Sequence, residues 1–291
     1  MKHGCVAAPG AFNGLVARAV AQAGFDAAYV SGAAVSASTG VPDVGLVSLD
    51  GFCAIVRQVT ASSGLPVVAD ADTGFGEVEM VARTVNAYND AGAAGLHLED
   101  QVFPKRCGHL DGKQLIPVDH FQEKVAIARK ASDQCSGGAF IVCARTDARG
   151  VEGLDATISR AKAFAEAGAD MIFPEGLASE DEFEAVAAAL SGMGGPSRTN
   201  GPYLLANMTE FGKTPMIPLK RFDELGYDFM IFPVTSLRIA MKAVTDAMAA
   251  IKREGSAASI LEDMQTRAEL YDLLGYTPGQ EWTYPNPTKP G

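Results

Sequence analysis

One pattern occurs four times along the chain, as AQAGFDAAYVSG (residues 21–32), NDAGAAGLHLED (89–100), AEAGADMIFPEG (165–176) and DELGYDFMIFPV (223–234). Each copy contains the end of a predicted helix, then a glycine, then a short apolar run. Glycine directly after a helix is a common cap, because it adopts the left-handed backbone conformation without steric cost. The apolar runs are nearly continuous rather than alternating, which is typical of a parallel sheet covered by helices. The pattern therefore predicts repeated helix–strand units.

Four further segments have the same apolar character and complete a set of eight predicted strands: 5–9, 66–72, 139–146 and 203–207. Amphipathic helical stretches separate most of them, for example 119–131 and 154–167. Eight strands that alternate with helices favour an α/β fold of the (β/α)8 TIM-barrel type. A doubly wound open sheet is the alternative, but it should carry a Gly-x-Gly-x-x-Gly loop after an early strand, and the sequence has none.

The length of 291 residues fits one such barrel. We expect a single domain over residues 1–291, with the barrel at about 5–255. A C-terminal helical segment and an irregular tail are expected at about 256–291, because the last part of this stretch is rich in proline.

Charge and composition exclude several kinds of partner. The formal net charge is −11, so nucleic acid and anionic membranes, which need a basic surface, are not expected to bind. No apolar run approaches the roughly 18 residues of a spanning helix, and residues 1–14 lack the pattern of a signal peptide.

The five cysteines form no Cys-x-x-Cys pair, which predicts reduced thiols and a cytoplasmic location. The mitochondrial matrix is the alternative for a eukaryotic chain whose presequence has been removed.

Polar residues close most of the predicted strands, at the end of the barrel where active sites of this fold lie. One Asp or Asn after a strand is often only a turn former, but acids and an Arg after several strands of one sheet favour a site. The strand-end residues are 31–32, 70–72, 99–100, 145–147, Glu175, Asn207, Thr209 and 233–236.

The carboxylates among them suggest a metal. Asp70, Asp72 and Glu99 follow neighbouring predicted strands, and Asp43 in the loop GVPDVG is a further candidate. Hard oxygen ligands in a cluster suit Mg²⁺, which binds through one or two carboxylates plus waters and substrate oxygens. The structural alternative is that Asp72 caps the next helix and Glu99 only pairs with Arg145.

The stretch KRCGHLDGK (105–113) follows the strand that ends at Glu99, so we expect it over the barrel mouth. Cations around Cys107 would lower the pKa of its thiol, so this cysteine is predicted to act as a nucleophile or to exchange a proton with carbon. Zinc is not expected, because no second Cys/His pair has a suitable spacing. Basic groups gathered at one mouth of an acidic protein predict a di- or tricarboxylate substrate. The candidates for these basic groups are Lys105, Arg106, Arg145, Arg238 and Arg267.

Several runs are shared with one enzyme superfamily: DADTGFG (70–76), GLHLEDQ (95–101), KRCGH (105–109), ARTDA (144–148), FPE (173–175), LANMTEFGKTP (205–215) and MQTRAELYDLLGY (264–276). Through them the chain resembles the isocitrate lyase/phosphoenolpyruvate mutase superfamily from about residue 6 to about residue 276. KRCGH is specific for the lyase branch, and the C-terminal run is similar to the methylisocitrate lyase family in particular.

The resemblance implies a Mg²⁺-dependent lyase, with Mn²⁺ as a substitute, that cleaves the tricarboxylate 2-methylisocitrate into pyruvate and succinate in the methylcitrate cycle of propionate catabolism. By similarity Asp70 binds the metal, while Asp43, Asp72 and Glu99 hold metal waters or substrate. Cys107 is the expected proton donor to carbon and Tyr29 a candidate base, and Lys105 and His109 complete the expected catalytic set. The expected substrate contacts are Ser31, Gly32, Ala33, Gly108, Arg145, Glu175, Asn207, Thr209, Arg238 and Arg267.

By similarity, Phe173 and Ile231 line a pocket for the substrate methyl group. Such a pocket discriminates weakly, because one methylene is worth only about 1–3 kcal/mol. Other members act on 2,3-dimethylmalate, oxaloacetate or isocitrate, and these substrates stay open alternatives. A catalytically silent barrel that senses a carboxylate and an enzyme of P–C bonds are further rivals, the latter disfavoured by Cys107.

The resemblance also implies an assembly. Members of this superfamily form homotetramers, built as dimers of dimers that exchange a C-terminal helix. Residues 236–255 and 259–274 are the segments expected to supply this exchange.

Overall fold

The computed structural model describes residues 4–108, 110–197 and 200–287, so His109 lies outside the described residues. Eight parallel strands form one sheet in the order β1-β8-β7-β6-β5-β4-β3-β2. Each strand lies within a segment for which the sequence predicts one, and the (β/α)8 fold is confirmed. The strands are β1 (Val6–Pro9), β2 (Ala28–Val30), β3 (Val67–Asp70), β4 (Gly95–Glu99), β5 (Ile141–Thr146), β6 (Met171–Pro174), β7 (Tyr203–Asn207) and β8 (Phe229–Phe232).

The sheet closes on itself between β1 and β2. Gly10 forms a parallel bridge with Tyr29, and the N–H of Ala11 donates to the carbonyl of Tyr29 at 2.8 Å. A Cβ atom on Gly10 would lie 2.2 Å from the carbonyl oxygen of Pro233, so only glycine fits where the end of β1 meets the end of β8. The closed ring leaves no long sheet edge exposed.

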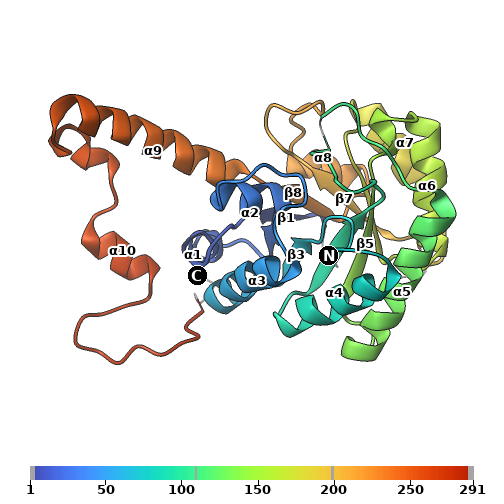
Figure 1. Cartoon of the computed structure of the whole chain (residues 1–291), viewed down its shortest axis with the longest axis horizontal. Helices are drawn as coiled ribbons and strands as arrows, with labels where there is room; N and C mark the ends of the chain where they lie inside the picture. Colours follow the sequence, from blue (N-terminus) through green and yellow to red (C-terminus); the bar gives the residue numbers. More distant parts are fainter. Residues whose placement is uncertain (1–3, 109, 198–199, 288–291) are drawn as a thin grey trace.

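Helices surround the ring on the outside (Figure 1). They are α1 (Gly14–Gln22), α2 (Gly32–Ser38), α3 (Leu49–Ser63), α4 (Val78–Asp90), α5 (Val118–Ser136), α6 (Leu154–Glu166), α7 (Glu180–Leu190) and α8 (Leu219–Glu224). The glycines of the fourfold sequence pattern, at 24, 92, 168 and 226, have φ of 81°, 89°, 106° and 83°. All four therefore adopt the left-handed conformation that ends a helix, which is why the repeated pattern predicts the fold.

Buried apolar side chains form two clusters, one on each face of the ring. The larger one lies between the strands and the helices and includes Leu96, Leu98 and Phe121. The smaller one fills the ring interior and includes Tyr29, Cys143, Met171, Phe173, Leu205, Phe229 and Ile231. Successive strand residues point to opposite faces. Along each strand, the inward-facing side chains therefore run from this apolar cluster to the carboxyl end of the strand.

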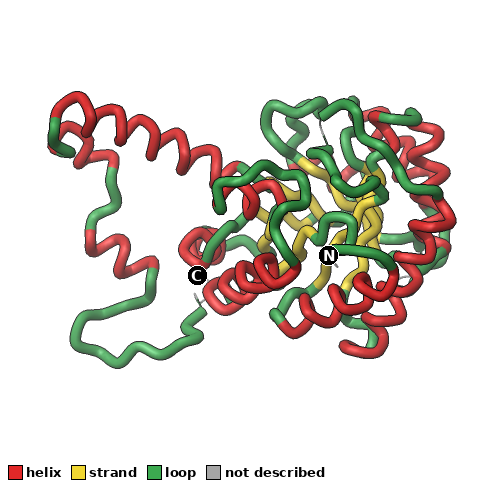
Figure 2. Tube along the Cα trace, viewed as in Figure 1, coloured by secondary structure: helices red, strands yellow, loops and turns green. Residues whose placement is uncertain are grey.

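The C-terminal part of the chain forms an arm. Helix α9 (Thr235–Glu254) projects away from the barrel, and the chain returns through the 3₁₀ helix η2 (Ala258–Asp263), α10 (Arg267–Leu273) and a long loop (Figures 1 and 2). The arm touches the barrel again at α1, where Gln22 Nε2 donates to Asp272 at 3.2 Å and the Arg18 guanidinium donates to the carbonyl of Asn286. Within the described residues, no helix has the length and apolar character needed to cross a bilayer.

Candidate active site

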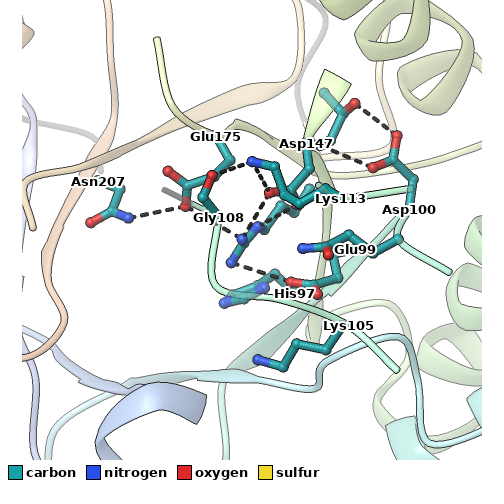
Figure 3. A network of polar contacts seen from close by, with 12 residues as sticks. His97, Glu99, Asp100, Lys105, Gly108, Lys113, Asp147, Glu175 and Asn207 are labelled. Carbon is teal, nitrogen blue, oxygen red and sulfur yellow. Dashed lines mark hydrogen bonds and ion pairs between the residues drawn. The ribbon is translucent and has the colours of Figure 1, made fainter. Parts of the chain in front are cut away.

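Polar side chains from neighbouring strands meet at the carboxyl end of the ring. The register places Asp70 of β3 beside His97 of β4, and Glu99 of β4 beside Arg145 of β5. Glu175 directly follows β6, and the Nδ2 of Asn207 at the end of β7 donates to its Oε2 at 3.0 Å. Figure 3 shows Glu99, Glu175 and Asn207 converging from different strand ends. The prediction that strand-end residues gather at one rim is confirmed for this set.

Most predicted site residues line one small cavity of about 90 Å³ at this rim. They are Tyr29, Ser31, Ala33, Asp43, Asp70, Cys107, Gly108, Arg145, Phe173, Glu175, Asn207, Thr209, Ile231 and Arg238. The cavity is small compared with the ligand pockets of several hundred Å³ that are typical of proteins. We therefore expect the loop with Cys107 and Gly108 to move outward when a tricarboxylate enters.

Larger hollows lie elsewhere on the described part of the chain. One, of about 1210 Å³, runs along α9, and another, of about 760 Å³, lies beside the strand-end loops and is lined by Phe103, Glu77 and Lys124 among others. We assign the site to the small cavity because buried charged groups converge there, whereas the groove along α9 is lined largely by apolar side chains.

Asp70 is held by backbone groups. The N–H of Gly32 donates to its Oδ2 at 2.9 Å, and the N–H of Asp72 donates to its Oδ1 at 3.0 Å. A Cβ on Gly32 would lie 2.6 Å from Asp70 Oδ2, so glycine is required for this approach. Burial alone would raise the pKa of Asp70, but the neighbouring His97 and Lys105 outweigh it, and the pKa falls below its usual value. Asp70 is therefore an ionised carboxylate aimed at the cavity.

Lys105 forms ion pairs with two further acidic side chains, Asp43 and Asp72. Its Nζ forms an ion pair with Asp43 and lies 2.7 Å from Asp72 Oδ1. Burial and the charge of Asp70 raise the pKa of Asp72 to about 6. Asp72 has a φ of 46°, a conformation in which Asp is tolerated. The alternative that Asp72 caps a helix is wrong, because α4 begins at Val78 and its N-cap is Glu77.

The acidic side chains of the site supply some, but not all, of the ligands that a divalent cation needs. Among the described residues, no group of three or more His, Cys, Asp and Glu side chains is arranged to hold a metal ion by itself. The Lys105 ammonium lies among the acids and balances part of their charge. Both carboxylate oxygens of Glu99 are buried without a hydrogen-bond donor, and burial raises its pKa well above the usual value. Mg²⁺ needs only one or two carboxylates, so Asp70 with Glu99 and Asp72 nearby is a suitable donor set.

Arg145 is the central cation of the site. Its Nε donates to Asp147 Oδ2 at 3.0 Å and its Nη2 to Asp147 Oδ1 at 3.1 Å, while Nη1 lies 3.3 Å from Glu99. The pairing of Glu99 with Arg145 expected by the structural alternative is thus present. The guanidinium also lies over the ring of Phe173, 5.2 Å from its centroid. Burial opposes the charge of Arg145, but the surrounding acids raise its pKa well above the usual value.

The loop that carries Cys107 lies against this cation. Gly108 is packed so closely that a Cβ would lie 2.4 Å from Glu175 Cγ and 2.5 Å from Arg145 Nη2. The loop is fixed before Cys107 as well, because the N–H of Arg106 donates to Gln101 Oε1 at 2.9 Å and Gln101 Nε2 donates back to the Arg106 carbonyl at 2.8 Å. Cys107 is half-buried and faces the same cavity as Arg145.

A histidine that the sequence prediction missed lies below the cavity. His97 is fully buried and its Nε2 lies 2.7 Å from the Tyr29 hydroxyl. Burial lowers the pKa of His97 to about 4 and raises that of Tyr29 well above its usual value, so both are neutral at pH 7. Tyr29 thus holds its proton here, and its role as a base stays a prediction. The signal in the sequence was a lone His at an inward position of an otherwise apolar strand.

Two predicted substrate arginines lie on the arm and differ in position. Arg238, in the first turn of α9, lines the cavity but is about half exposed, 3.7 Å from Glu210 and stacked on Phe211. Arg267 begins α10 and is exposed, and within one chain it lines a separate shallow hollow with Tyr271 and Tyr276. The structure therefore does not bring Arg267 to the cavity of its own chain, because the arm carries it outward.

A (β/α)8 barrel with buried acidic and basic side chains at the carboxyl ends of its strands has the architecture of a barrel enzyme. Comparison with known proteins leads to the same class. The family model for phosphoenolpyruvate phosphomutase matches residues 1–252. The chain belongs to this family and to the phosphoenolpyruvate mutase/isocitrate lyase superfamily, which confirms the resemblance found in the sequence.

Individual relatives are similar over nearly the whole chain. A probable 2-methylisocitrate lyase of Corynebacterium glutamicum is 49% identical over 92% of this chain and 84% of its own length. The 2-methylisocitrate lyase of Bacillus subtilis is 45% identical with the same coverage. The 2,3-dimethylmalate lyase of Eubacterium barkeri is more distant, at 39% over 93% of this chain and 89% of its own.

Solved structures show the same fold. A crystal structure of 2,3-dimethylmalate lyase matches with a TM-score of 0.85 and 38% identity, covering 94% of this chain and 87% of that one. A phosphonopyruvate hydrolase solved as a complex with oxalate and Mg²⁺ matches with a TM-score of 0.80 and 29% identity, covering 93% and 90%.

Proposed function

We propose that this chain is a carbon–carbon lyase that cleaves 2-methylisocitrate into pyruvate and succinate. The observation that carries the proposal is the placement of the Cys107–Gly108 turn directly on Arg145 and Glu175, over a cavity that also contains Asp70, Phe173 and Ile231. Five relatives named 2-methylisocitrate lyase or probable 2-methylisocitrate lyase are 43–49% identical to the chain over 92–94% of its length. Two others with this name are 38 and 39% identical, close to the 39% of the 2,3-dimethylmalate lyase.

One carbon–carbon bond breaks in the reaction. A proton leaves the oxygen on one carbon of this bond, and another proton is added to the other carbon. The hydroxyl on C2 of the substrate gives its proton to a carboxylate or a water at the cavity, the C2–C3 bond breaks, and C2 becomes the ketone carbon of pyruvate. The electron pair of the bond remains on C3, next to a carboxylate. The thiol of Cys107 donates its proton to C3, which completes succinate and leaves a thiolate. The thiolate regains a proton before the next turnover.

The residues around the cavity match the charges in this reaction. Arg145, held by Asp147 and Glu99, presents a fixed guanidinium to a carboxylate of the substrate. The donor stays in one orientation throughout the reaction, so it stabilises the charge that develops on the succinate part without reorganising. Gly108 lines the cavity directly beside Arg145 and Glu175, where it would exclude water from the bound substrate. Phe173 and Ile231 form the apolar wall that suits a methyl group.

Mg²⁺ is part of the proposal. Asp70 would hold it, with Asp72, Asp43 and Glu99 placed to accept hydrogen bonds from its waters. The ion would act as a Lewis acid on the C2 oxygen and its neighbouring carboxylate. The buried oxygens of Glu99 that receive no hydrogen bond support this assignment. We place the enzyme in propionate catabolism by the methylcitrate cycle, because the proposed substrate belongs to that route.

A substrate panel tests the proposal. Purified protein with Mg²⁺ is given 2-methylisocitrate, isocitrate, 2,3-dimethylmalate or oxaloacetate at equal concentration, and pyruvate, glyoxylate, propionate and oxalate are followed separately. The highest kcat/KM is expected for 2-methylisocitrate. A higher value for any other member of the panel would retain the lyase barrel and replace the proposed substrate.

We also propose one barrel domain per chain and a homotetramer in which the arm is exchanged between subunits. On α9, the apolar side chains of Met241, Val244, Met248 and Ile251 follow at three- and four-residue spacing and are 50, 47, 55 and 37% exposed. Met241 and Val244 border the large groove along this helix. A second copy that covers this face would bury the apolar stripe, and the exchange would bring Arg267 near the site of another chain.

A further inference from the structure

Lys113 is a buried lysine that the proposed reaction does not use. It ends the stretch KRCGHLDGK, and only 7% of its surface is exposed. Removing an ammonium group from water costs several kcal/mol unless partners compensate for the loss. The groups around Nζ therefore indicate what this side chain contributes.

The ammonium joins the Cys107 turn to the end of β5. Its Nζ donates to the carbonyl oxygen of Gly108, the residue directly after Cys107, and lies 3.1 Å from Asp147 Oδ1 (Figure 3). Lys113 thus attaches Gly108, and with it the backbone next to Cys107, to a carboxylate on the barrel.

The same carboxylate orients Arg145. Asp147 is fully buried and accepts from both Nε and Nη2 of Arg145, at 3.0 and 3.1 Å. Its own N–H donates to Asp100 Oδ1 at 2.9 Å, which fixes it to the end of β4. Because Lys113 and Arg145 share one fixed carboxylate, the position of the Cys107 turn and the position of the guanidinium depend on the same group.

A second ion pair on this turn provides a comparison. Asp111 lies two residues before Lys113 and pairs with Lys213 at 2.6 Å, but their side chains are 88 and 48% exposed. Exposed pairs contribute only about 0–1 kcal/mol. The exposed pair therefore cannot replace the buried contacts of Lys113 in holding the turn.

We propose that Lys113 is a positioning residue, which through Gly108 and Asp147 holds the Cys107 thiol and the Arg145 guanidinium over the cavity at the same time. Lys113 does not touch the reacting atoms itself. The consequence for turnover rests on the proposed lyase reaction, whereas the consequence for the geometry of the turn does not.

The experiment compares Lys113→Met, which keeps the length of the side chain and removes the donor, with the matched control Asp111→Asn on the same turn. Pyruvate release from 2-methylisocitrate gives kcat and KM. The rate at which iodoacetamide alkylates Cys107 in the substrate-free protein is followed by mass spectrometry of the Cys107 peptide. Thermal unfolding reports whether each variant is folded.

For Lys113→Met we expect kcat to fall by about 100-fold, as for a displacement of reacting groups by about 1 Å, while KM changes much less. Alkylation of Cys107 should become about tenfold faster, because the open turn becomes more populated. Asp111→Asn should match the wild type in all measurements. A role limited to stability would lower the unfolding temperature and leave kcat and the alkylation rate of the folded fraction unchanged.

Wild-type kcat together with wild-type alkylation in Lys113→Met would overturn the proposal. If that variant does not fold, Lys113→Gln, which retains an N–H donor and lacks the charge, is measured in the same way and judged by the same criteria. Failure of the wild type to release pyruvate from 2-methylisocitrate would refute the lyase proposal alone, and the alkylation rates would still decide the role of Lys113.

Discussion

Gly108 is the position where the closed site leaves no room for one additional carbon. A Cβ there would lie 2.4 Å from Glu175 Cγ, 2.5 Å from Arg145 Nη2 and 2.7 Å from Glu175 Cδ. Gly108 does not have a positive φ, so Gly108→Ala adds this clash without backbone strain. Overpacking of this kind costs about 1–3 kcal/mol. Since each 1.36 kcal/mol is a factor of ten, the closed turn should be disfavoured by about 5- to 150-fold.

The cost should appear in catalysis and not in stability, because the turn can open without unfolding the barrel. We expect kcat/KM for 2-methylisocitrate to fall by about 5- to 150-fold, with an unfolding temperature close to that of the wild type. Gly194→Ala is the matched control, because its Cβ would meet no atom within 4 Å and its φ is not positive. Wild-type activity of Gly108→Ala would refute the argument that this turn must seat on Arg145 and Glu175.

Three further changes test other parts of the account. EDTA should abolish pyruvate formation and Mg²⁺ or Mn²⁺ should restore it, because an ion held by Asp70 would supply the Lewis acid for the C2 oxygen; full turnover in EDTA would rule out the metal. Ile231→Ala, which removes one wall of the expected methyl pocket, should lower the preference for 2-methylisocitrate over isocitrate by about 10- to 200-fold in kcat/KM; an unchanged ratio would place the methyl group elsewhere. Val244→Glu should reduce the mass measured by light scattering from that of four chains, because a charge in an apolar interface is costly; an unchanged mass would show that this face of α9 is not an interface.

The fold could be predicted because local chemistry and global arrangement agree in this chain. Glycines at 24, 92, 168 and 226 end helices with a positive φ, and the apolar run after each one becomes a buried strand. The rim was predictable for the same reason, since the carboxyl ends of parallel strands meet at one end of the ring. Asp70, Glu99, Arg145, Glu175 and Asn207 are all found there.

The rest of the site depends on contacts between segments far apart in the sequence, which spacing does not encode. Nothing near Lys113 in the chain indicates that its ammonium is buried against Asp147. The neutral pair of Tyr29 and His97 likewise arises from burial inside the ring. Arg267 is similar to a substrate residue by its sequence, yet the arm carries it away from its own barrel. The role of Arg267 depends on an assembly that a single chain does not contain. The cellular compartment also stays a prediction.

The central claim is that Cys107 delivers a proton to carbon when 2-methylisocitrate is cleaved. Its most direct test is the rate of pyruvate release by the wild type and by Cys107→Ser, side by side with Mg²⁺, with binding of the substrate measured for both. The account predicts steady pyruvate formation by the wild type, a loss of at least about 100-fold in the variant, and similar binding by both proteins. Substantial turnover by Cys107→Ser would contradict the account.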